Sequence, residues 1–306
     1  MNRNIFKFTI KITIIAFVCL CVMNCNKEDF ITSGICGKDQ YNLLTWQFND
    51  EDGVLTIKGN GYMINFSTLE NHPWAHLRKK IKTVIIDQGV KNIGAFAFND
   101  CYELTSLTIP NSVLAIEYAA FFGCSLTSVF IPSSVISIES FAFIGNHLTD
   151  FDVDVKNIHY SSFNGVLYNK LQDTLICYPG GKTEIVTFPN TATTITSAAF
   201  YGCQNITSIE IPNSIVKIED YALSSCPLTS LIIGNSDITI GELAFNERYL
   251  KSITCKGFNP PNIVVGDRAT FYSVPANTPV YIPSGALSAY QNSNWGKVFS
   301  NFIEEL

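Results

Sequence analysis

Apolar and polar residues follow a fixed period over the middle of the chain. The stretch Leu104–Ser125 reads LTSLTIPNSVLAIEYAAFFGCS, and it returns 22 residues later as LTSVFIPSSVISIESFAFIGNH in Leu126–His147. Two further copies occupy Ile206–Pro227 and Leu228–Tyr249, and a slightly longer version occupies Ile81–Glu103. Self-similarity at a period of this size indicates stacked supersecondary units. A unit this small cannot bury its own apolar face, so the repeats predict coils that cover one another.

Each copy opens with apolar residues at its first, fourth and sixth places. In one copy these are Leu104, Leu107 and Ile109, with Thr and Ser between them and Pro110 after them. A short run rich in Thr, Ile and Val predicts a strand whose alternate residues face inward. Proline ends this strand because it has no N–H to donate to a strand ladder.

An Ala-Phe pair closes the second apolar cluster of each copy. It occurs at Ala97–Phe98, Ala120–Phe121, Ala142–Phe143, Ala199–Phe200 and Ala244–Phe245, with Ala222–Leu223 as a variant. We expect the small residue to let neighbouring turns approach and the ring to fill the space between coils.

The combined pattern LxxLxIPxSVxxIxxxAFxxC resembles the BspA-like leucine-rich repeats of bacterial surface proteins. The resemblance covers residues from about Ile81 to Tyr249. It implies a β-rich α/β solenoid of right-handed coils, with parallel strands along one face. It also implies a secreted or surface-attached protein that binds other proteins and does not catalyse a reaction.

The segments on either side of the repeats have a different composition. Residues 33–80 resemble the N-terminal cap of such proteins, and Asp52-Gly53 predicts a hairpin between Leu44–Phe48 and Val54–Lys58. Residues 155–182 interrupt the repeats 81–249 and predict a hairpin laid on the solenoid. Residues 250–306 resemble a final repeat and a C-terminal cap, with one strand at Val280–Pro283 and a short closing helix at Ala286–Trp295.

The N-terminus predicts export. Three basic residues precede the apolar run Ile12–Met23, which is shorter than the roughly 20 residues that span a bilayer. We interpret residues 1–24 as a signal peptide, Cys25 as a lipidated residue and 25–32 as a tether. The acidic run that follows resembles the export signal of Gram-negative surface lipoproteins, although Val22-Met23-Asn24 departs from the usual cleavage pattern. The alternative is an ordinary secretory signal, which would make the protein secreted.

The charge of the chain excludes one class of partner. The whole chain carries a net charge of −6, with 20 basic and 26 acidic residues. Removal of residues 1–24 takes away three basic residues, so the mature chain has 17 minus 26, or −9. A chain this acidic, without a basic stripe, argues against nucleic acid as a partner. We expect a membrane contact only through the lipid anchor.

One repeat position holds Cys or Asn in five coils, at Cys101, Cys124, Asn146, Cys203 and Cys226. A turn that needs a small buried group able to bond the backbone explains this choice, so we expect a structural ladder of reduced thiols. The alternative is a disulfide between Cys101 and Cys124 or between Cys203 and Cys226. The pattern assigns no place to Cys36, Cys177 or Cys255.

Few residues suggest chemistry. His72 and His76 have the spacing of two metal ligands, but Pro73 disfavours a helix there and no zinc-protease glutamate follows. Asp150, Asp152 and Asp154 alternate along one strand, so they form either a cation site or a solvated acidic edge. We therefore expect no metal, no cofactor and no catalysis.

The fifth place of each copy lies between two inward places and should face outward. It varies, whereas the second place is mostly Thr. We interpret this variable column as either a protein-binding surface or gap-filling side chains. The candidate binding residues are Ile85, Thr108, Phe130, Asp152, Glu210 and Ile232, with Thr187 and Thr254 in the same column.

These features predict a lipid-anchored outer-membrane protein at the surface of a Gram-negative bacterium. It would bind a host or bacterial surface protein through its strand face. The alternative is a glycan-binding accessory of a nutrient-uptake system, which clustering of Tyr62, Trp74, Tyr160 and Tyr168 would favour.

Overall fold

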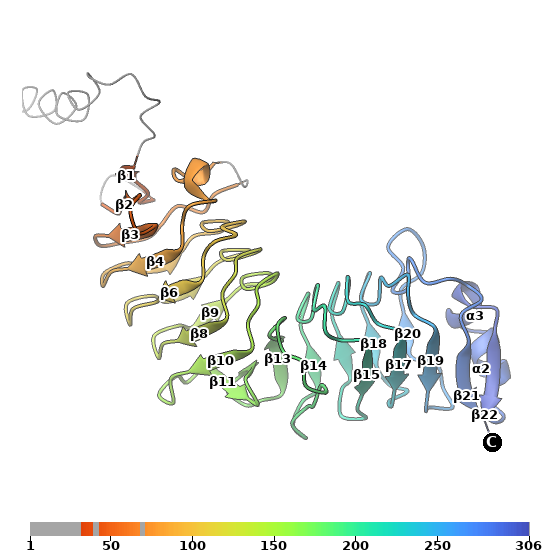
Figure 1. The fold of residues 1–306 in the computed structure, drawn as a ribbon. Helices are drawn as coiled ribbons and strands as arrows, with labels where there is room; N and C mark the ends of the chain where they lie inside the picture. The colour runs from red at the N-terminus through yellow and green to blue at the C-terminus, as the bar shows by residue number, and fades with distance from the viewer. Residues whose placement is uncertain (1–31, 39–42, 68–70, 306) are drawn as a thin grey trace, which may run out of the picture. The chain divides into compact units, whose positions relative to one another are not determined.

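The computed structural model describes residues 32–38, 43–67 and 71–305. The signal peptide, Cys25 and most of the tether lie outside the described residues, and everything from Thr32 onward belongs to one unit. The repeats form a β-solenoid, in which each coil contributes a longer strand and a shorter strand to two parallel ladders (Figure 1).

The longer strands carry the apolar places that begin each repeat. They are β4 (Thr83–Ile86), β6 (Ser106–Thr108), β8 (Ser128–Ile131), β10 (Asp150–Val153), β15 (Ser208–Ile211), β17 (Ser230–Ile233), β19 (Ser252–Cys255) and β21 (Val280–Pro283). Their pairing is parallel and in repeat register, so that Ile209, Leu231 and Ile253 align and are all buried. The alternation of Thr and Ser with Ile and Leu predicts this pattern, because successive side chains of a strand point to opposite faces.

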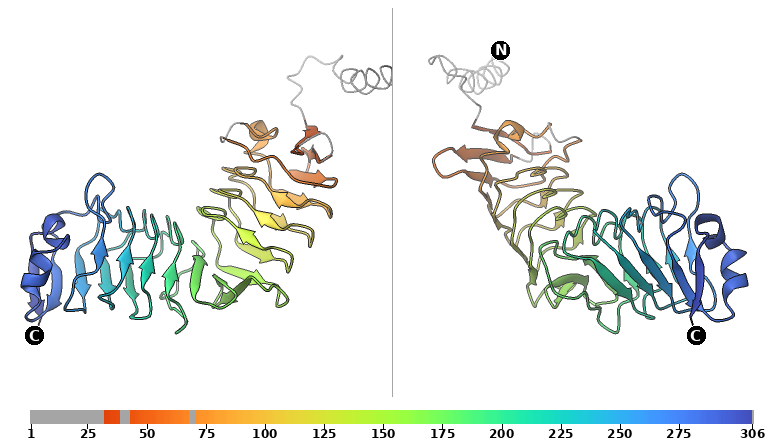
Figure 2. Two further views of the ribbon diagram at one scale, coloured as in Figure 1. Left: turned by 180° about the vertical axis from the view of Figure 1, so that it is seen from behind. Right: turned by 45° about the vertical axis from the view of Figure 1, so that its right-hand side comes forward.

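The shorter strands form two further parallel sets, one before and one after the insertion, that the sequence pattern did not predict. They are β5 (Asn92–Ile93), β7 (Ala115–Ile116), β9 (Ser137–Ile138), β14 (Thr194–Ile195), β16 (Lys217–Ile218), β18 (Thr239–Ile240) and β20 (Asn262–Ile263). Two residues per coil are too few to show a period in the sequence. The views in Figure 2 show the strands of successive coils side by side.

The insertion adds three strands, β11 (Tyr160–Phe163), β12 (Val166–Asn169) and β13 (Thr174–Cys177). β12 pairs antiparallel with both β11 and β13, and β13 then pairs parallel with β14. The insertion therefore joins the ladder of short strands. Residues 183–189 form no strand, so the long-strand ladder is interrupted between β10 and β15.

Aromatic rings of the Ala-Phe pairs stack in the core. The ring centroids of Phe98 and Phe121 are 5.2 Å apart, and those of Phe121 and Phe143 are 5.6 Å apart, with the rings nearly parallel. Trp74 stacks on Phe98 at 5.5 Å, and its Nε1 donates a hydrogen bond of 2.7 Å to the Ala97 carbonyl. The rings thus fill the space between coils, as the Ala-Phe repeat predicts.

The first strands precede the repeats as an antiparallel set. β1 (Ser33–Ile35), β2 (Thr45–Asn49) and β3 (Val54–Lys58) pair antiparallel in that order, and β3 pairs parallel with β4. A single 3₁₀ turn, η2 (Ala75–Leu77), follows them. His72 is buried against Phe66 and Trp74, so it lies in the aromatic core of this segment.

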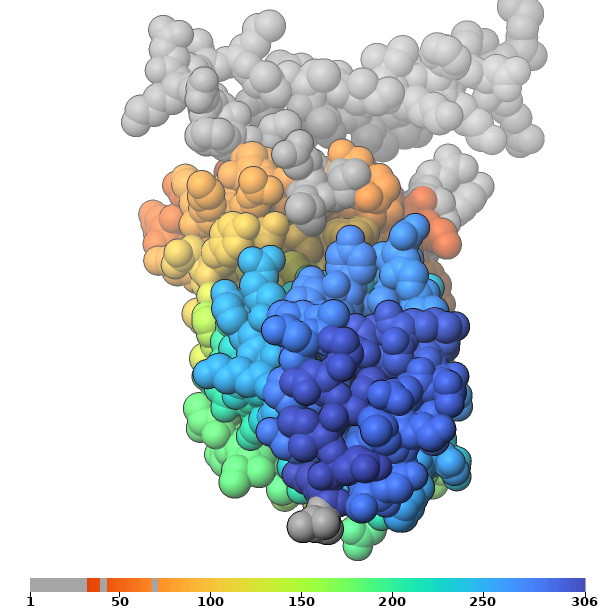
Figure 3. Space-filling model, turned by 90° about the vertical axis from the view of Figure 1, so that its right-hand side faces the viewer, coloured from red at the N-terminus to blue at the C-terminus, as the bar shows by residue number. Residues whose placement is uncertain are grey.

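The C-terminal residues cover the last coil. Instead of the one helix expected over Ala286–Trp295, there are two, α2 (Leu287–Gln291) and α3 (Trp295–Val298). Trp295 and Phe299 pack on Phe271, and β22 (Phe302–Glu305) pairs parallel with β21. Figure 3 shows these residues in dark blue over the end of the stack. None of the described helices has the length and apolar character needed to traverse a bilayer.

The turns around the Ala-Phe pairs hold residues in the left-handed region, two in five of the turns and Leu243 alone in the turn at Ala244–Phe245. The first column comprises Phe96, Ala119, Phe141, Ala198, Tyr221 and Leu243, and the second comprises Asp100, Gly123, Gly145, Gly202 and Ser225. A non-glycine residue pays about 1–2 kcal/mol for this conformation. The turn brings backbone N–H groups of one coil to carbonyls of the next, as in Phe98 to Ala120 (2.8 Å) and Phe200 to Ala222 (2.7 Å).

Two glycines of the second column provide a matched test of this turn. An alanine methyl at Gly202 would meet no atom within 4 Å, whereas one at Gly145 would lie 3.2 Å from the Gly123 Cα and N of the preceding coil. We expect Gly202→Ala to cost about 1 kcal/mol, the backbone penalty alone. Gly145→Ala should cost more, because the coils must also separate. Urea unfolding measures both, and equal losses would show that coil spacing does not constrain this turn.

Candidate functional site

The variable column lies on the longer strands. Ile85 pairs with Thr108, Phe130 with Asp152, and Glu210 with Ile232. Phe130 is 48% exposed, Thr108, Asp152 and Glu210 are exposed, and Ile85 and Ile232 are half-buried.

The ladder of longer strands divides this column into three parts. Its sheets comprise β1–β2–β3–β4–β6, β8–β10 and β15–β17–β19–β21–β22. Phe130 and Ile232 therefore lie in different sheets and form no single apolar patch. Thr187, which was expected in this column, lies in the segment that forms no strand.

The surroundings of the column are mixed in character. Ile232 lies between Glu210 and Thr254, and Lys256 Nζ is 2.6 Å from Glu210 Oε1 in an exposed ion pair. Such exposed pairs contribute little to stability, at most about 1 kcal/mol. The face offers apolar contacts beside charges of both signs, which suits binding of a macromolecular surface.

The Cys and Asn ladder lies inside the solenoid, and the seven cysteines from Cys36 onward are all free and buried. Cys124 Sγ donates to the Phe98 carbonyl at 3.1 Å, and Cys226 Sγ donates to the Phe200 carbonyl at 3.0 Å. Asn146 Nδ2 donates to the Phe121 carbonyl at 2.7 Å, while its Oδ1 accepts from the Leu126 N–H at 3.0 Å. These side chains satisfy turn carbonyls of the preceding coil.

Burial keeps these thiols protonated. It raises the pKa of Cys36, Cys177 and Cys255 to about 12, and it raises the pKa of Cys101, Cys124, Cys203 and Cys226 well above the ordinary value. The thiolate is the nucleophilic form of cysteine, so none of these seven residues is activated for attack.

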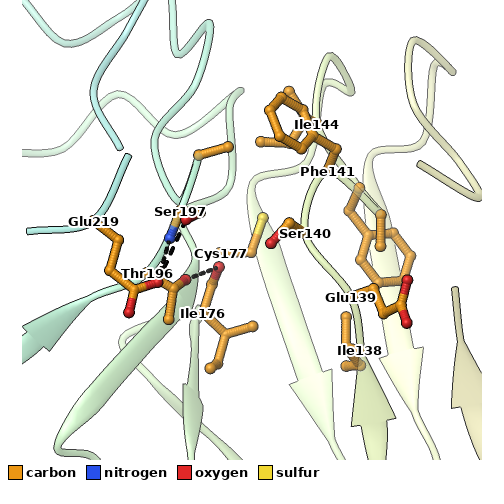
Figure 4. Close-up of a pocket in the computed structure, with 13 residues that line it drawn as sticks. Ile138, Glu139, Ser140, Phe141, Ile144, Ile176, Cys177, Thr196, Ser197 and Glu219 are labelled. Carbon is orange, nitrogen blue, oxygen red and sulfur yellow. Dashed lines mark hydrogen bonds between the residues drawn. The ribbon is translucent and has the colours of Figure 1, made fainter. Parts of the chain in front are cut away.

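A cavity of about 160 Å³ lies where the insertion meets the repeats (Figure 4). Glu139 and Glu219 lie on opposite sides of it. Glu139 Oε2 accepts from the Tyr118 N–H at 2.9 Å, and Glu219 Oε2 accepts from the Ser197 N–H at 3.1 Å. Burial would raise the pKa of Glu219, but hydrogen bonds from Lys217 and Ser197 hold it below the ordinary value. Both carboxylates therefore serve the structure.

The same cavity lacks an activated nucleophile. Its lining includes Ser140, Ser197 and Cys177 but no histidine or lysine. A serine needs an adjacent base before it can attack, and the Cys177 thiol is held protonated by burial.

The acidic strand residues serve separate purposes. Asp150 Oδ1 lies 3.7 Å from Lys182 Nζ, and Asp154 Oδ1 accepts from the Lys156 N–H at 2.9 Å. In the part of the chain that the structure describes, no three His, Cys, Asp or Glu residues are placed to hold a metal ion.

The aromatic residues that would have favoured a glycan site do not cluster on the surface. Tyr62 is 46% exposed, but Trp74, Tyr160 and Tyr168 are buried. Other aromatic residues do gather at the surface, on the turns after the short strands. They are Phe96, Tyr118, Phe122, Phe141 and Tyr201, and we call them the aromatic strip. The sequence signal was the aromatic residues flanking the Ala-Phe pairs.

Comparison with known families decides which proteins share this arrangement. The model of the BspA type leucine rich repeat region (6 copies) matches residues 70–177 and 175–293. The chain is a BspA-type leucine-rich-repeat protein. Comparison with curated proteins gives no match.

Two solved structures resemble this BspA-type protein in fold. A leucine rich cell surface protein from Faecalibacterium prausnitzii A2-165 has a TM-score of 0.57 and 20% identity, over 89% of this chain and 95% of that chain. The pneumococcal vaccine antigen PcpA has a TM-score of 0.50 and 17% identity, over 89% of this chain and 100% of that chain.

One acid inside the BspA-type solenoid was missed by the sequence analysis. Glu247 is 4% exposed, and its Oε1 accepts from the Cys226 N–H at 2.7 Å. Burial raises the pKa of Glu247 to about 7, although hydrogen bonds from the Cys226 and Ser225 backbone oppose the shift. Its place after an Ala-Phe pair marks it as part of the turn, but nothing in the sequence distinguishes it from an exposed acid.

Glu247 makes stability depend on pH. The pKa of Glu247 is higher in the folded protein than in the unfolded chain, so a protonated Glu247 adds to the free energy of unfolding. This contribution is complete below about pH 4.5 and is lost as pH rises through about 7. The loss is on the order of 3 kcal/mol. Glu247→Gln keeps the acceptor and removes the titration, so we expect it to be more stable than the wild type above pH 7. Urea unfolding from pH 4.5 to 8 measures this, with exposed Glu103→Gln as control. Parallel pH profiles for Glu247→Gln and the wild type would contradict it.

Proposed function

We propose that this protein is a non-catalytic binding protein of the bacterial cell surface, and that it binds a protein partner through the face of its longer strands. The observation that carries the proposal is the contrast between columns. The inward places of the longer strands repeat Leu, Ile and Val in coil after coil, while the outward place between them changes.

Packing explains the contrast only in part. Ile209, Leu231 and Ile253 are buried and must fit their neighbours in adjacent coils. The outward place need not fit the core of an adjacent coil. A plain scaffold could repeat Thr there, because cross-strand Thr pairs fit a pleated surface. In this chain it varies, and the six candidate residues are Ile85, Thr108, Phe130, Asp152, Glu210 and Ile232. Chemically different side chains on the outward face of three parallel sheets support specific recognition.

The absence of an activated group in the Glu139–Glu219 cavity supports a binding role over catalysis. Repeat solenoids of this family typically bind and do not catalyse. Because a fold hosts many functions, the choice of a protein partner rests on the character of the strand face.

The partner site can be tested by changing the apolar members of the column. Phe130→Ser combined with Ile232→Ser should abolish retention of a partner and lower the melting temperature by only a few degrees, because both side chains are at least partly exposed. The measurement compares the surface proteins retained by immobilised residues 26–306 of wild type and variant, with mass spectrometry and a melting curve.

Ile136 provides the matched control, since it is 52% exposed and lies outside the column. Ile136→Ser should retain the same partner as the wild type. Equal retention by all three proteins would refute a strand-face site, and a large loss of melting temperature in the double variant would show that the column belongs to the core.

The proposed location is the outer membrane of a Gram-negative bacterium, with Cys25 as the lipidated residue. The basic residues and apolar run before Cys25, and the acidic run after it, support this assignment. Several acyl chains on one cysteine would give stable anchoring, which a single chain does not.

Lipidation can be tested by metabolic labelling with a radioactive fatty acid. The wild type should incorporate label and remain with membranes, whereas Cys25→Ala should do neither. Cys21→Ala serves as control, because it removes a neighbouring cysteine without touching the proposed site. Release of an unlabelled wild-type protein into the medium would instead identify a secreted protein.

A further inference from the structure

The aromatic strip crosses several coils, and its rings remain at least partly exposed. Ring centroids are 5.4 Å apart for Phe96 and Tyr118, 5.5 Å for Tyr118 and Phe141, and 5.4 Å for Phe141 and Tyr201. Phe122 adds a fifth ring, 6.4 Å from Phe141. Tyr118 is 40% exposed and the other four rings are half-buried. Together they bound a hollow of about 350 Å³.

Two oxygen acceptors lie at the same hollow. Asn99 is 3% exposed, and its Oδ1 has no hydrogen-bond partner among the described residues. A buried acceptor left unpaired costs about 1–3 kcal/mol, so a donor supplied from outside would be stabilised there. Asp100 adds a carboxylate, and none of the ion pairs among described residues includes it.

A later coil shows what covers the same turn. Tyr221 occupies the left-handed place that Phe96 and Phe141 occupy in earlier coils. The guanidinium carbon of Arg268 lies 5.5 Å from the centre of the Tyr221 ring, and its Nη2 donates to the Tyr221 hydroxyl at 2.7 Å. Arg268 Nε also pairs with Glu242. The protein itself thus places a guanidinium between an aromatic face and a carboxylate at this turn.

We propose that the aromatic strip is a second binding surface, which takes arginine side chains from a basic segment of a protein partner. A guanidinium is planar, stacks on aromatic rings and carries donors only, so it complements five rings, a carboxylate and an unpaired amide oxygen. The charge of the chain favours the same partner, since its 26 acidic residues outnumber 20 basic ones. The strip follows the short strands and does not depend on the long-strand face.

Two peptides test the ligand class. One carries three arginines separated by glycines, and the other has citrulline, the neutral isostere, in their place. Calorimetry with the folded chain should show the arginine peptide binding about tenfold more tightly, since cation–π attraction contributes about 0.5–2 kcal/mol and the ion pair adds to it. Equal affinities would overturn the proposal.

Matched variants test the site. Asp100→Asn removes the charge and keeps a residue that tolerates the left-handed turn, so it should weaken arginine-peptide binding by about fivefold. Asp237→Asn removes the same charge from an exposed residue outside both proposed surfaces and should leave binding unchanged. Tyr118→Leu should weaken binding by a similar factor, whereas Tyr118→Phe retains the ring and should not.

Other outcomes separate this surface from its alternatives. Equal losses in Asp100→Asn and Asp237→Asn would show diffuse charge attraction and refute a built site. A different result would identify a glycan surface instead. In that case cellohexaose would bind, Tyr118→Leu would abolish that binding, and the arginine and citrulline peptides would bind equally. Phe130→Ser should bind the arginine peptide as tightly as the wild type does. The test of the aromatic strip therefore does not depend on the strand-face proposal. If Tyr118→Leu fails to fold, the comparison of Asp100→Asn with Asp237→Asn decides the matter.

Discussion

Covering of each coil by the next is the interaction on which this structure depends. One coil contributes a few apolar side chains and leaves its strand N–H and C=O groups open on both sides. The neighbouring coil supplies partners to the long strand, the short strand and the Ala-Phe turn together. In the turn, the Phe98 N–H donates a hydrogen bond to the Ala120 carbonyl, and the rings of Phe98 and Phe121 stack in the core beside it. Left-handed residues in each turn are tolerated because the hydrogen bonds and stacked rings that require them recur in each coil.

The same constraint explains how the insertion is accommodated. Asn157 is fully buried, and its Nδ2 donates to the carbonyls of Pro132 and Val135 in the preceding coil. Its Oδ1 accepts from the His159 and Tyr160 N–H groups, so this side chain is satisfied on both sides. The inserted strands pair with β14 and begin the second sheet of short strands, which is separate from β5, β7 and β9. The coils beyond the insertion thus have a hydrogen-bonded partner in β13, although the long-strand ladder stops.

Stacking also determines where function can lie. The inward side chains pack against neighbouring coils, and Cys124, Cys226 and Asn146 donate to turn carbonyls. What remains free to differ between coils is the outward place of the long strands and the residues flanking the Ala-Phe pair. These two sets lie on different parts of each coil, and they differ in chemistry. The strand column mixes apolar and charged groups, whereas the aromatic strip joins contiguous rings with oxygen acceptors.

The sequence by itself determined the repeat, the positions of the long strands and the rings between coils, because each arises from short-range periodicity that recurs at fixed spacing. The parallel arrangement of the strands was implied by the family resemblance. The sequence also identified Cys101, Cys124, Asn146, Cys203 and Cys226 as one position. Only the tertiary structure decided that two-residue strands form a second ladder, that residues 183–189 form none, and that the C-terminal helix is broken. It alone showed Trp74 and Tyr168 buried while Tyr118 and Phe141 remain accessible. Exposure depends on what the neighbouring coil covers, and that neighbour lies about one repeat away in the chain.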